Sequence, residues 1–171
     1  MNCYEEISQY EMERRLHFDY IFHASGTGTT QAGLICGQLL HKDYRKIVGI
    51  SIVRKNPRGR DVVLNSIHEY CKENEISTEE TTIQKNTIFI DDYAGEGYGK
   101  RNKEVLKTIC EVMKKYGIPM DSTYTAKAFW GMKKYLIEQK ITGKNVLFIH
   151  TGGTPLFFDD LRKIENEYTN S

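Results

Sequence analysis

A run of glycine and hydroxyl residues, Ser25-Gly-Thr-Gly-Thr-Thr30, lies between a short apolar segment and a segment of helical character. The junction of a strand end and a helix start favours an anion, because free backbone N–H groups and the helix dipole point toward it. The glycines let the backbone approach closely, and the threonine hydroxyls can donate to phosphate oxygens. The predicted phosphate-binding residues are Gly26, Thr27, Gly28, Thr29 and Thr30.

The residues that follow the loop and the spacing of its glycines exclude two common kinds of phosphate-binding loop. No Lys-Ser/Thr pair follows, which excludes a P-loop, and the glycine spacing differs from the GxGxxG of dinucleotide folds. Taken alone, the loop leaves two alternatives open. One is a tight turn with a capping threonine, and the other is a site for a different small phosphate, such as a nucleotide or sugar phosphate.

Three further segments carry residues that could serve the same site. Asp91 to Lys100 (DDYAGEGYGK) is a glycine-rich loop, Pro119 to Lys127 (PMDSTYTAK) leads into a helix, and His150 to Pro155 (HTGGTP) follows an apolar run. Each segment alone also fits a surface aromatic, a helix start or a simple turn. Their value lies in their order and combination.

The elements that must position these loops follow from apolar spacing and turn residues. Strands are predicted over Asp19–Ala24, Ile47–Val53, Thr87–Ile90 and Asn145–His150. Helices are predicted over Tyr4–Leu16, Thr30–His41, Pro57–Asn74, Lys103–Tyr116 and Thr125–Lys140, and the polar tail from Arg162 is expected to fray. This alternation predicts an α/β fold, an open and mostly parallel sheet with helices on both faces, in one domain spanning residues 1–171.

Composition excludes several classes of protein. Lys and Arg total 24 against 23 Asp and Glu, and no basic stripe stands out, so a nucleic-acid partner is not expected. No apolar run approaches the roughly 20 residues of a membrane helix, so no membrane span is expected. The four cysteines form no CxxC pair and the first residues are charged, which suits the cytoplasm, and no metal site is predicted.

Together the segments resemble the family of D-cysteine desulfhydrase and 1-aminocyclopropane-1-carboxylate (ACC) deaminase, pyridoxal-phosphate enzymes of the tryptophan-synthase-β-like fold. The resemblance runs from about Tyr20 to Phe158, on HASGTGTTQAGL, GISIVR, EGYGK, DSTYTAKA and NVLFIHTGG. It implies the C-terminal part of the large domain, pyridoxal 5'-phosphate held at Gly26 to Thr30, and an amino-acid substrate. It further implies that Tyr98 and Tyr124 are catalytic, on the substrate side of the ring, and that Thr151 and Gly152 lie at the pyridine nitrogen.

Two positions separate the two activities within this family. Deaminases of this type carry Glu after the second active-site tyrosine and Leu after the histidine of the HTGG segment, where this chain has Thr125 and Thr151. A hydroxyl only hydrogen-bonds the pyridine nitrogen, whereas a carboxylate favours its protonated form. The resemblance therefore favours β-elimination from D-cysteine to pyruvate, hydrogen sulfide and ammonia, with ACC deaminase as the alternative.

Family members are longer than this chain, and their Schiff-base lysine lies in an N-terminal half that precedes its first residue. We therefore expect no activity from the chain alone, and an uncovered apolar surface that favours a homo- or hetero-oligomer. A split enzyme, with the N-terminal half supplied as a separate chain, and a non-catalytic remnant both stay open. Lys127 is expected to support the site, since family members carry a lysine here in addition to the catalytic one.

Overall fold

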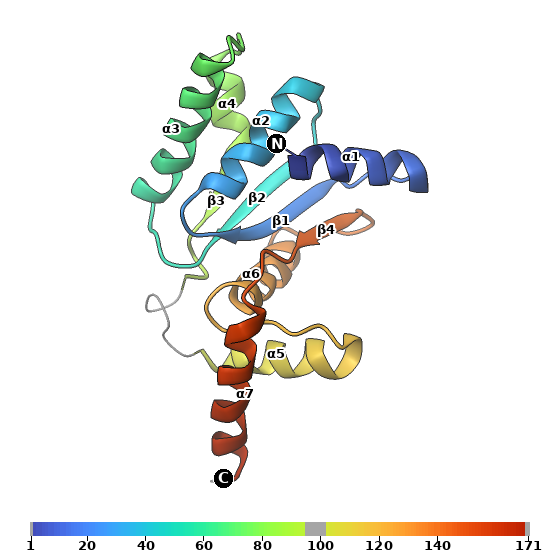
Figure 1. Cartoon of the computed structure of the whole chain (residues 1–171), viewed down its shortest axis with the longest axis vertical. Helices are drawn as coiled ribbons and strands as arrows, with labels where there is room; N and C mark the ends of the chain where they lie inside the picture. Colours follow the sequence, from blue (N-terminus) through green and yellow to red (C-terminus); the bar gives the residue numbers. More distant parts are fainter. Residues whose placement is uncertain (1, 95–101, 170–171) are drawn as a thin grey trace.

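The computed structural model describes residues 2–94 and 102–169, and it contains the predicted alternation of strands and helices (Figure 1). The strands are β1 (Tyr20–Ser25), β2 (Lys46–Ser51), β3 (Ile88–Ile90) and β4 (Val146–Ile149). The helices are α1 (Asn2–Arg14), α2 (Thr29–His41), α3 (Arg58–Glu73), α4 (Glu80–Asn86), α5 (Lys103–Tyr116), α6 (Thr125–Glu138) and α7 (Thr154–Thr169).

The four described strands form one parallel sheet in the order β3-β2-β1-β4. Tyr20 of β1 lies in register with Lys46 of β2 on one side and with Val146 of β4 on the other. The chain thus leaves β1 toward β2 and later returns to the opposite side of β1. At such a reversal of strand order the loops after the two adjacent strands, here β1 and β4, diverge, and ligands bind in the crevice between them.

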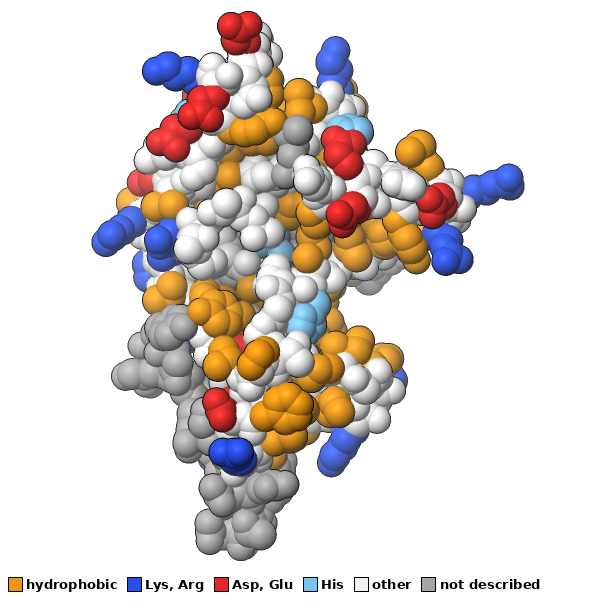
Figure 2. Space-filling model, viewed as in Figure 1, with side chains coloured by type: hydrophobic (Ala, Val, Ile, Leu, Met, Phe, Trp, Pro, Cys, Tyr) orange, Lys and Arg blue, Asp and Glu red, His pale blue; other side chains and the backbone are white. Residues whose placement is uncertain are grey.

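Strand β4 forms one edge of the described sheet, and the surface beside it is apolar. A groove of about 310 Å³ runs between α1 and β4, and Figure 2 shows hydrophobic side chains gathered on the side of α1 that faces β4. The groove is lined by Cys3, Glu6, Ile7, Tyr10, Phe18 and Leu147. An edge strand with an apolar flank is a surface on which another polypeptide can add a strand.

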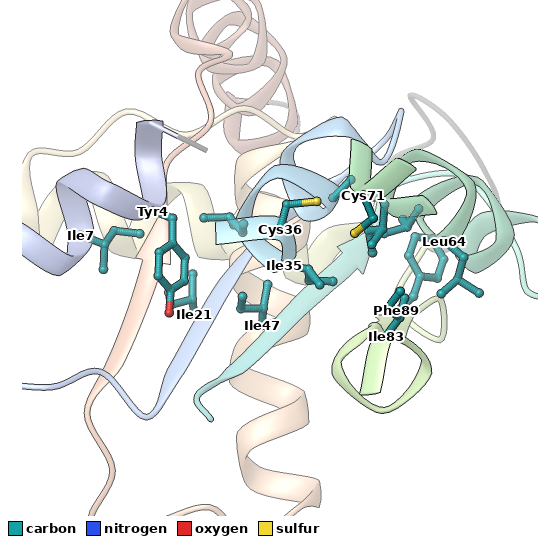
Figure 3. Close-up of a cluster of buried hydrophobic side chains, with 14 residues drawn as sticks. Tyr4, Ile7, Ile21, Ile35, Cys36, Ile47, Leu64, Cys71, Ile83 and Phe89 are labelled. Atoms are coloured by element: carbon teal, nitrogen blue, oxygen red, sulfur yellow. The ribbon is translucent and has the colours of Figure 1, made fainter. Parts of the chain in front are cut away.

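Helices cover both faces of the sheet, as predicted. On one face, Ile21 and Ile47 pack with buried side chains of α1 to α4 (Figure 3). On the other face, Phe22 and Val48 pack against α6, and α5 and α7 lie outside α6 around a third cluster that includes Ile109. The period-2 alternation of Ile21 and Phe22 places adjacent residues of one strand in separate cores.

A buried charged network joins α1 to the loop between α2 and β2. The Arg45 guanidinium donates to Glu11, with 2.7 Å between Nη2 and Oε2, and its Nε donates to Asp43. Asp43 also accepts from the Tyr4 hydroxyl, while Glu11 accepts from the backbone N–H of Phe18 at 2.6 Å. The two acidic side chains and the guanidinium thus satisfy one another within the fold.

The structure differs from the sequence expectation at two helices. Helix α4 was not predicted, because its seven residues bury only Ile83 and so present no repeating apolar stripe. Helix α7 continues to Thr169, whereas the tail from Arg162 was expected to fray. Phe157 and Ile164 are seven residues apart and both join the cluster with α5, so two turns of packing extend this helix.

Two further observations bear on the expected surroundings of the protein. Among the described residues, no helix is long and apolar enough to cross a membrane. All four cysteines are free thiols, and Cys36 and Cys71 are buried in the core between α2 and α3.

Candidate functional site

A cavity of about 340 Å³ opens at the carboxyl ends of the central strands, where the strand order reverses. Its volume falls within the range of small-molecule sites. The loops after β1, β2 and β4 and the start of α6 contribute its walls. The lining residues are Ala24, Gly26, Thr27, Thr30, Ile52, Val53, Arg54, Tyr124 and Thr151. Five predicted site residues therefore meet here: Gly26, Thr27, Thr30, Tyr124 and Thr151.

The loop after β1 presents its backbone to the cavity. Gly28 is the N-cap of α2 with φ 91° and carries no side-chain oxygen, so the alternative of a capping threonine is wrong. The first-turn N–H groups of α2 are consequently left for a ligand. A Cβ at Gly28 would lie 3.1 Å from Val63 Cγ2, in a backbone conformation that L-residues rarely adopt.

The three threonines of the loop have different surroundings. Thr27 and Thr30 line the cavity. Thr29 is exposed and outside the lining, and its hydroxyl oxygen lies 3.3 Å from that of Thr27. Thr27 and Thr30 therefore contribute hydroxyl-bearing side chains to the cavity lining, while the Thr29 hydroxyl contacts that of Thr27.

The loop after β4 forms the opposite wall. His150 Nε2 donates to the Pro119 carbonyl at 2.8 Å, and Thr151 reaches the cavity lining. Gly152 has φ 109° and lies outside the lining. Gly153 has φ 86°, and a Cβ there would lie 2.4 Å from Asp121 Oδ1. This second glycine of HTGG is thus required by close contact with the 119–125 segment.

Asp121 is a positioning residue that the sequence analysis missed. Its fully buried carboxylate accepts from the backbone N–H groups of Thr123, Tyr124 and Thr125 and from the Thr125 hydroxyl. These bonds start α6 and place Tyr124 at the cavity. An acidic side chain just before a helical pattern is a capping signal that could have revealed this role.

Thr125 itself does not line the cavity. It is fully buried, and its hydroxyl lies between the Asp121 backbone N–H at 3.0 Å and the Asp121 carboxylate at 2.8 Å. Its use as a marker of specificity stays a prediction. In this chain its direct physical effect is on the start of α6.

Lys127 is buried beside the cavity, with its side chain directed at backbone oxygens. Its Nζ donates to the carbonyls of Ile52 and Ala94, each at 3.2 Å. Burial lowers the pKa of this amine, and the negative charge of Asp121 acts in the opposite direction. The ammonium therefore joins the loop after β2 to the segment after β3, which fits the expected supporting role.

Of the two tyrosines in the DDYAGEGYGK loop, the structure describes only Tyr93. Tyr98 lies outside the described residues, so its expected catalytic role stays a prediction. Tyr93 is buried, its hydroxyl donates to Glu138, and its ring packs edge-on against Trp130. Burial, followed by the contact with Glu138, raises the pKa of this phenol. Tyr93 is thus part of the packing between α6 and the sheet.

A parallel α/β sheet with an anion loop at its switch point defines a protein that binds a small phosphorylated molecule. The sequence profile described as pyridoxal-phosphate dependent enzyme matches residues 1–152. The chain belongs to this family, whose cofactor is pyridoxal phosphate.

Relatives with curated names agree with this assignment. A Pyrococcus abyssi protein named "Putative 1-aminocyclopropane-1-carboxylate deaminase" is 35% identical over 143 residues, which cover 84% of this chain and 42% of the relative. A Ralstonia nicotianae protein named 1-aminocyclopropane-1-carboxylate deaminase is 30% identical over 153 residues, covering 88% of this chain and 44% of the relative. The chain spans about half the length of the curated relatives it matches.

A solved structure has the same fold. The crystal structure described as an ACC deaminase homologue superposes with a TM-score of 0.82 and 29% identity, covering 95% of this chain and 48% of that one. The tryptophan-synthase-β-like α/β architecture inferred from the sequence motifs is therefore confirmed.

The residues at the cavity fit the family's cofactor. The uncapped start of α2 and the hydroxyls of Thr27 and Thr30 match a phosphate group. Thr151 and Tyr124, whose side chains carry hydroxyls, also line the cavity, and a substituted pyridine ring can use hydroxyl groups of this kind. Gly26 leaves room for close approach, since a Cβ there would already contact Ile52 Cδ1 at 3.3 Å.

Proposed function

We propose that this chain is the cofactor-binding part of a pyridoxal-phosphate-dependent lyase of D-cysteine desulfhydrase type. The observation that carries the proposal is the meeting of the β1 loop, Tyr124 and Thr151 around one cavity. The reaction takes D-cysteine and one water to pyruvate, hydrogen sulfide and ammonia. When bound, the cofactor supplies the electron-withdrawing ring that this β-elimination requires.

The chain's own residues then bind and orient. The first-turn N–H groups of α2, with the hydroxyls of Thr27 and Thr30, hold the phosphate group. Thr151 provides a neutral hydrogen bond to the ring nitrogen. The Tyr124 phenol holds a proton at its oxygen on the substrate side, where the leaving sulfur can accept it.

A second candidate is ACC deaminase, and the names of the relatives favour it. Thr125 and Thr151, in place of the Glu and Leu of deaminases, favour desulfhydrase chemistry instead, because ring opening of ACC benefits from the carboxylate that makes the pyridine ring more strongly electron-withdrawing. The two candidates share the same cofactor cradle and differ in the substrate that is turned over.

We further propose that a polypeptide segment equivalent to the part of the relatives that this chain does not match supplies the cofactor-binding lysine and docks at β4. The edge position of β4 in the described sheet and the apolar groove beside it support this. Pairing of a strand with β4 would bury Phe18 and Leu147, which line that groove. Further association of such pairs gives a homo- or hetero-oligomer.

We assign the protein to the cytoplasm. The support is the set of four free thiols, of which Cys3 is exposed and Cys110 is partly exposed. Accessible unpaired thiols are maintained in a reducing compartment.

One experiment separates these alternatives. The purified chain receives pyridoxal phosphate and D-cysteine or ACC, with and without the protein encoded immediately upstream, and sulfide and ammonia are measured. Sulfide that requires the partner, with a borohydride-fixed cofactor on the partner chain, supports the split desulfhydrase. Sulfide from the chain without the partner would show that the partner's lysine is not required. Ammonia produced from ACC, with no sulfide produced from D-cysteine, selects the deaminase. Cofactor binding without turnover under every condition identifies a non-catalytic remnant, and absence of binding refutes the proposed site.

A further inference from the structure

One cation stands at the wall of the cavity. Of its nine described lining residues, Arg54 is the one with a charged side chain. The sequence analysis assigned it no role, although it ends the GISIVR motif. A single positive charge among hydroxyl, glycine and apolar residues gives the cavity a preference for anions.

The backbone of Arg54 is held in place at the end of β2. The Ser51 hydroxyl donates to the Arg54 carbonyl at 2.6 Å and lies 3.3 Å from the N–H of Val53. This local hydrogen bonding stabilises the bend that follows β2. The arginine side chain is thereby directed toward the loop that follows β1.

The guanidinium contacts the phosphate loop itself. Arg54 Nη1 donates to the Thr27 carbonyl at 3.0 Å, which uses one of the five N–H donors that a guanidinium carries. The nearby acidic residue Asp91 accepts from the backbone and side-chain N–H groups of Asn56 instead. Arg54 is therefore anchored beside the loop by a neutral acceptor, and no carboxylate pairs with it among residues 2–94 and 102–169.

A phosphate monoester needs such a charge. It carries between one and two negative charges near neutral pH, and a helix N-terminus offers only about half a positive charge. The planar fork of a guanidinium matches phosphate oxygens in both geometry and charge. The neutral hydroxyls of Thr27 and Thr30 add donors without adding charge.

We propose that Arg54 is a phosphate ligand in this protein: it keeps Nη1 on the Thr27 carbonyl and donates its other N–H groups to the cofactor phosphate. This inference rests on the proposed function, because it assigns a further residue to the same cofactor site. It predicts that the site discriminates strongly between pyridoxal phosphate and pyridoxal.

The test measures binding of three probes to the wild-type chain and its variants by absorbance and by competition. The probes are pyridoxal phosphate, inorganic phosphate and unphosphorylated pyridoxal, and any partner required for cofactor binding is included. Arg54→Gln is expected to weaken pyridoxal phosphate and inorganic phosphate by roughly 10- to 100-fold, and pyridoxal by less than about twofold. Arg54→Lys keeps the positive charge but loses the planar guanidinium, so its affinities for the two phosphorylated probes are expected to lie between those of the wild type and of Arg54→Gln.

The matched control is Arg58→Gln. Arg58 is an exposed arginine four residues away that does not line the cavity, and it should leave all three affinities unchanged. Circular dichroism establishes that each variant is folded. Equal weakening of phosphorylated and unphosphorylated probes would overturn the proposal, since Arg54 would then act only by holding Thr27. Unchanged phosphate binding would also overturn it. A wild-type chain that binds no phosphorylated probe refutes the proposed function itself.

Discussion

Two arginines at opposite ends of the sheet show how the same side chain serves different purposes. Arg45 has a side chain only 4% exposed, is paired with Glu11 and Asp43, and lies over the Tyr4 ring. Arg54 lies at an open cavity and donates to a backbone carbonyl. A charge compensated within the fold serves stability, whereas a charge held by a neutral acceptor is available to a ligand.

The largest expected effect comes from breaking the compensated charge. Arg45→Met leaves Glu11 and Asp43 without their cation, and we expect the free energy of unfolding to fall by about 3–5 kcal/mol. Arg54→Met, the matched change at the cavity, should cost less than about 1 kcal/mol. Urea unfolding followed by circular dichroism measures both. Similar losses for the two variants would contradict the distinction between the regions.

Strand β1 pairs with β2, which joins the two regions, and it carries a buried histidine that makes stability depend on pH. Burial lowers the pKa of His23 to about 4, although its hydrogen bond to the Ala24 carbonyl acts in the opposite direction. The unfolded chain takes up the proton near the ordinary value of about 6.5 while the folded chain resists it. Stability is therefore lost as pH falls from 6.5 to 4, by about 3 kcal/mol from this group.

The His23→Gln variant tests this expectation. Unfolding free energies measured between pH 7.5 and 4 should show a smaller decline for this variant than for the wild type. His68→Gln removes a histidine near the surface, where its ring contacts Glu80, and serves as the comparison. An unchanged profile in His23→Gln would mean that other groups cause the acid loss.

A smaller effect separates strain from ligand binding in the cavity loop. Gly28→Ala places a Cβ at φ 91° and close to Val63, which should cost about 1–2 kcal/mol of stability and weaken pyridoxal phosphate about tenfold. Gly143→Ala imposes the same kind of strain at φ 64°, where a Cβ meets nothing within 4 Å. It should cost similar stability without changing cofactor affinity. Equal pyridoxal-phosphate affinities in the two variants would mean that the loop after β1 does not bind the phosphate.

The smallest expected effect is that of salt. Raising sodium chloride about tenfold should weaken inorganic phosphate binding several-fold, because the charge of Arg54 faces an open cavity. The difference in stability between wild type and Arg45→Met should change less, because that pair is buried. Titrations and unfolding curves at both salt concentrations measure this contrast. A greater effect of salt on the Arg45 stability difference than on phosphate binding would contradict the distinction between a buried and an accessible charge.

Local sequence signals predicted most of the fold and the backbone part of the site. The β-branched runs around Ile21 and Ile47 formed the expected strands, and Gly117 ended α5 with φ 68°, because propensity and turn chemistry act over a few residues. The run from Gly26 to Thr30 became the expected junction of strand and helix. Helix α4 was not predicted because its single buried residue, Ile83, gives no repeating apolar pattern.

The sequence by itself determined which loops could bind an anion, and its motifs identified the pyridoxal-phosphate family, because such signals lie in consecutive residues. Only the tertiary structure decided which side chains meet. The reversal of strand order brings Thr151 to Thr27, residues far apart in the chain, and packing turns Thr125 inward onto Asp121. Arg54 acquires its position through a hydrogen bond from Ser51 to its carbonyl and one from its side chain to the Thr27 carbonyl. Contacts of this kind depend on the whole sheet, so no local pattern predicts them.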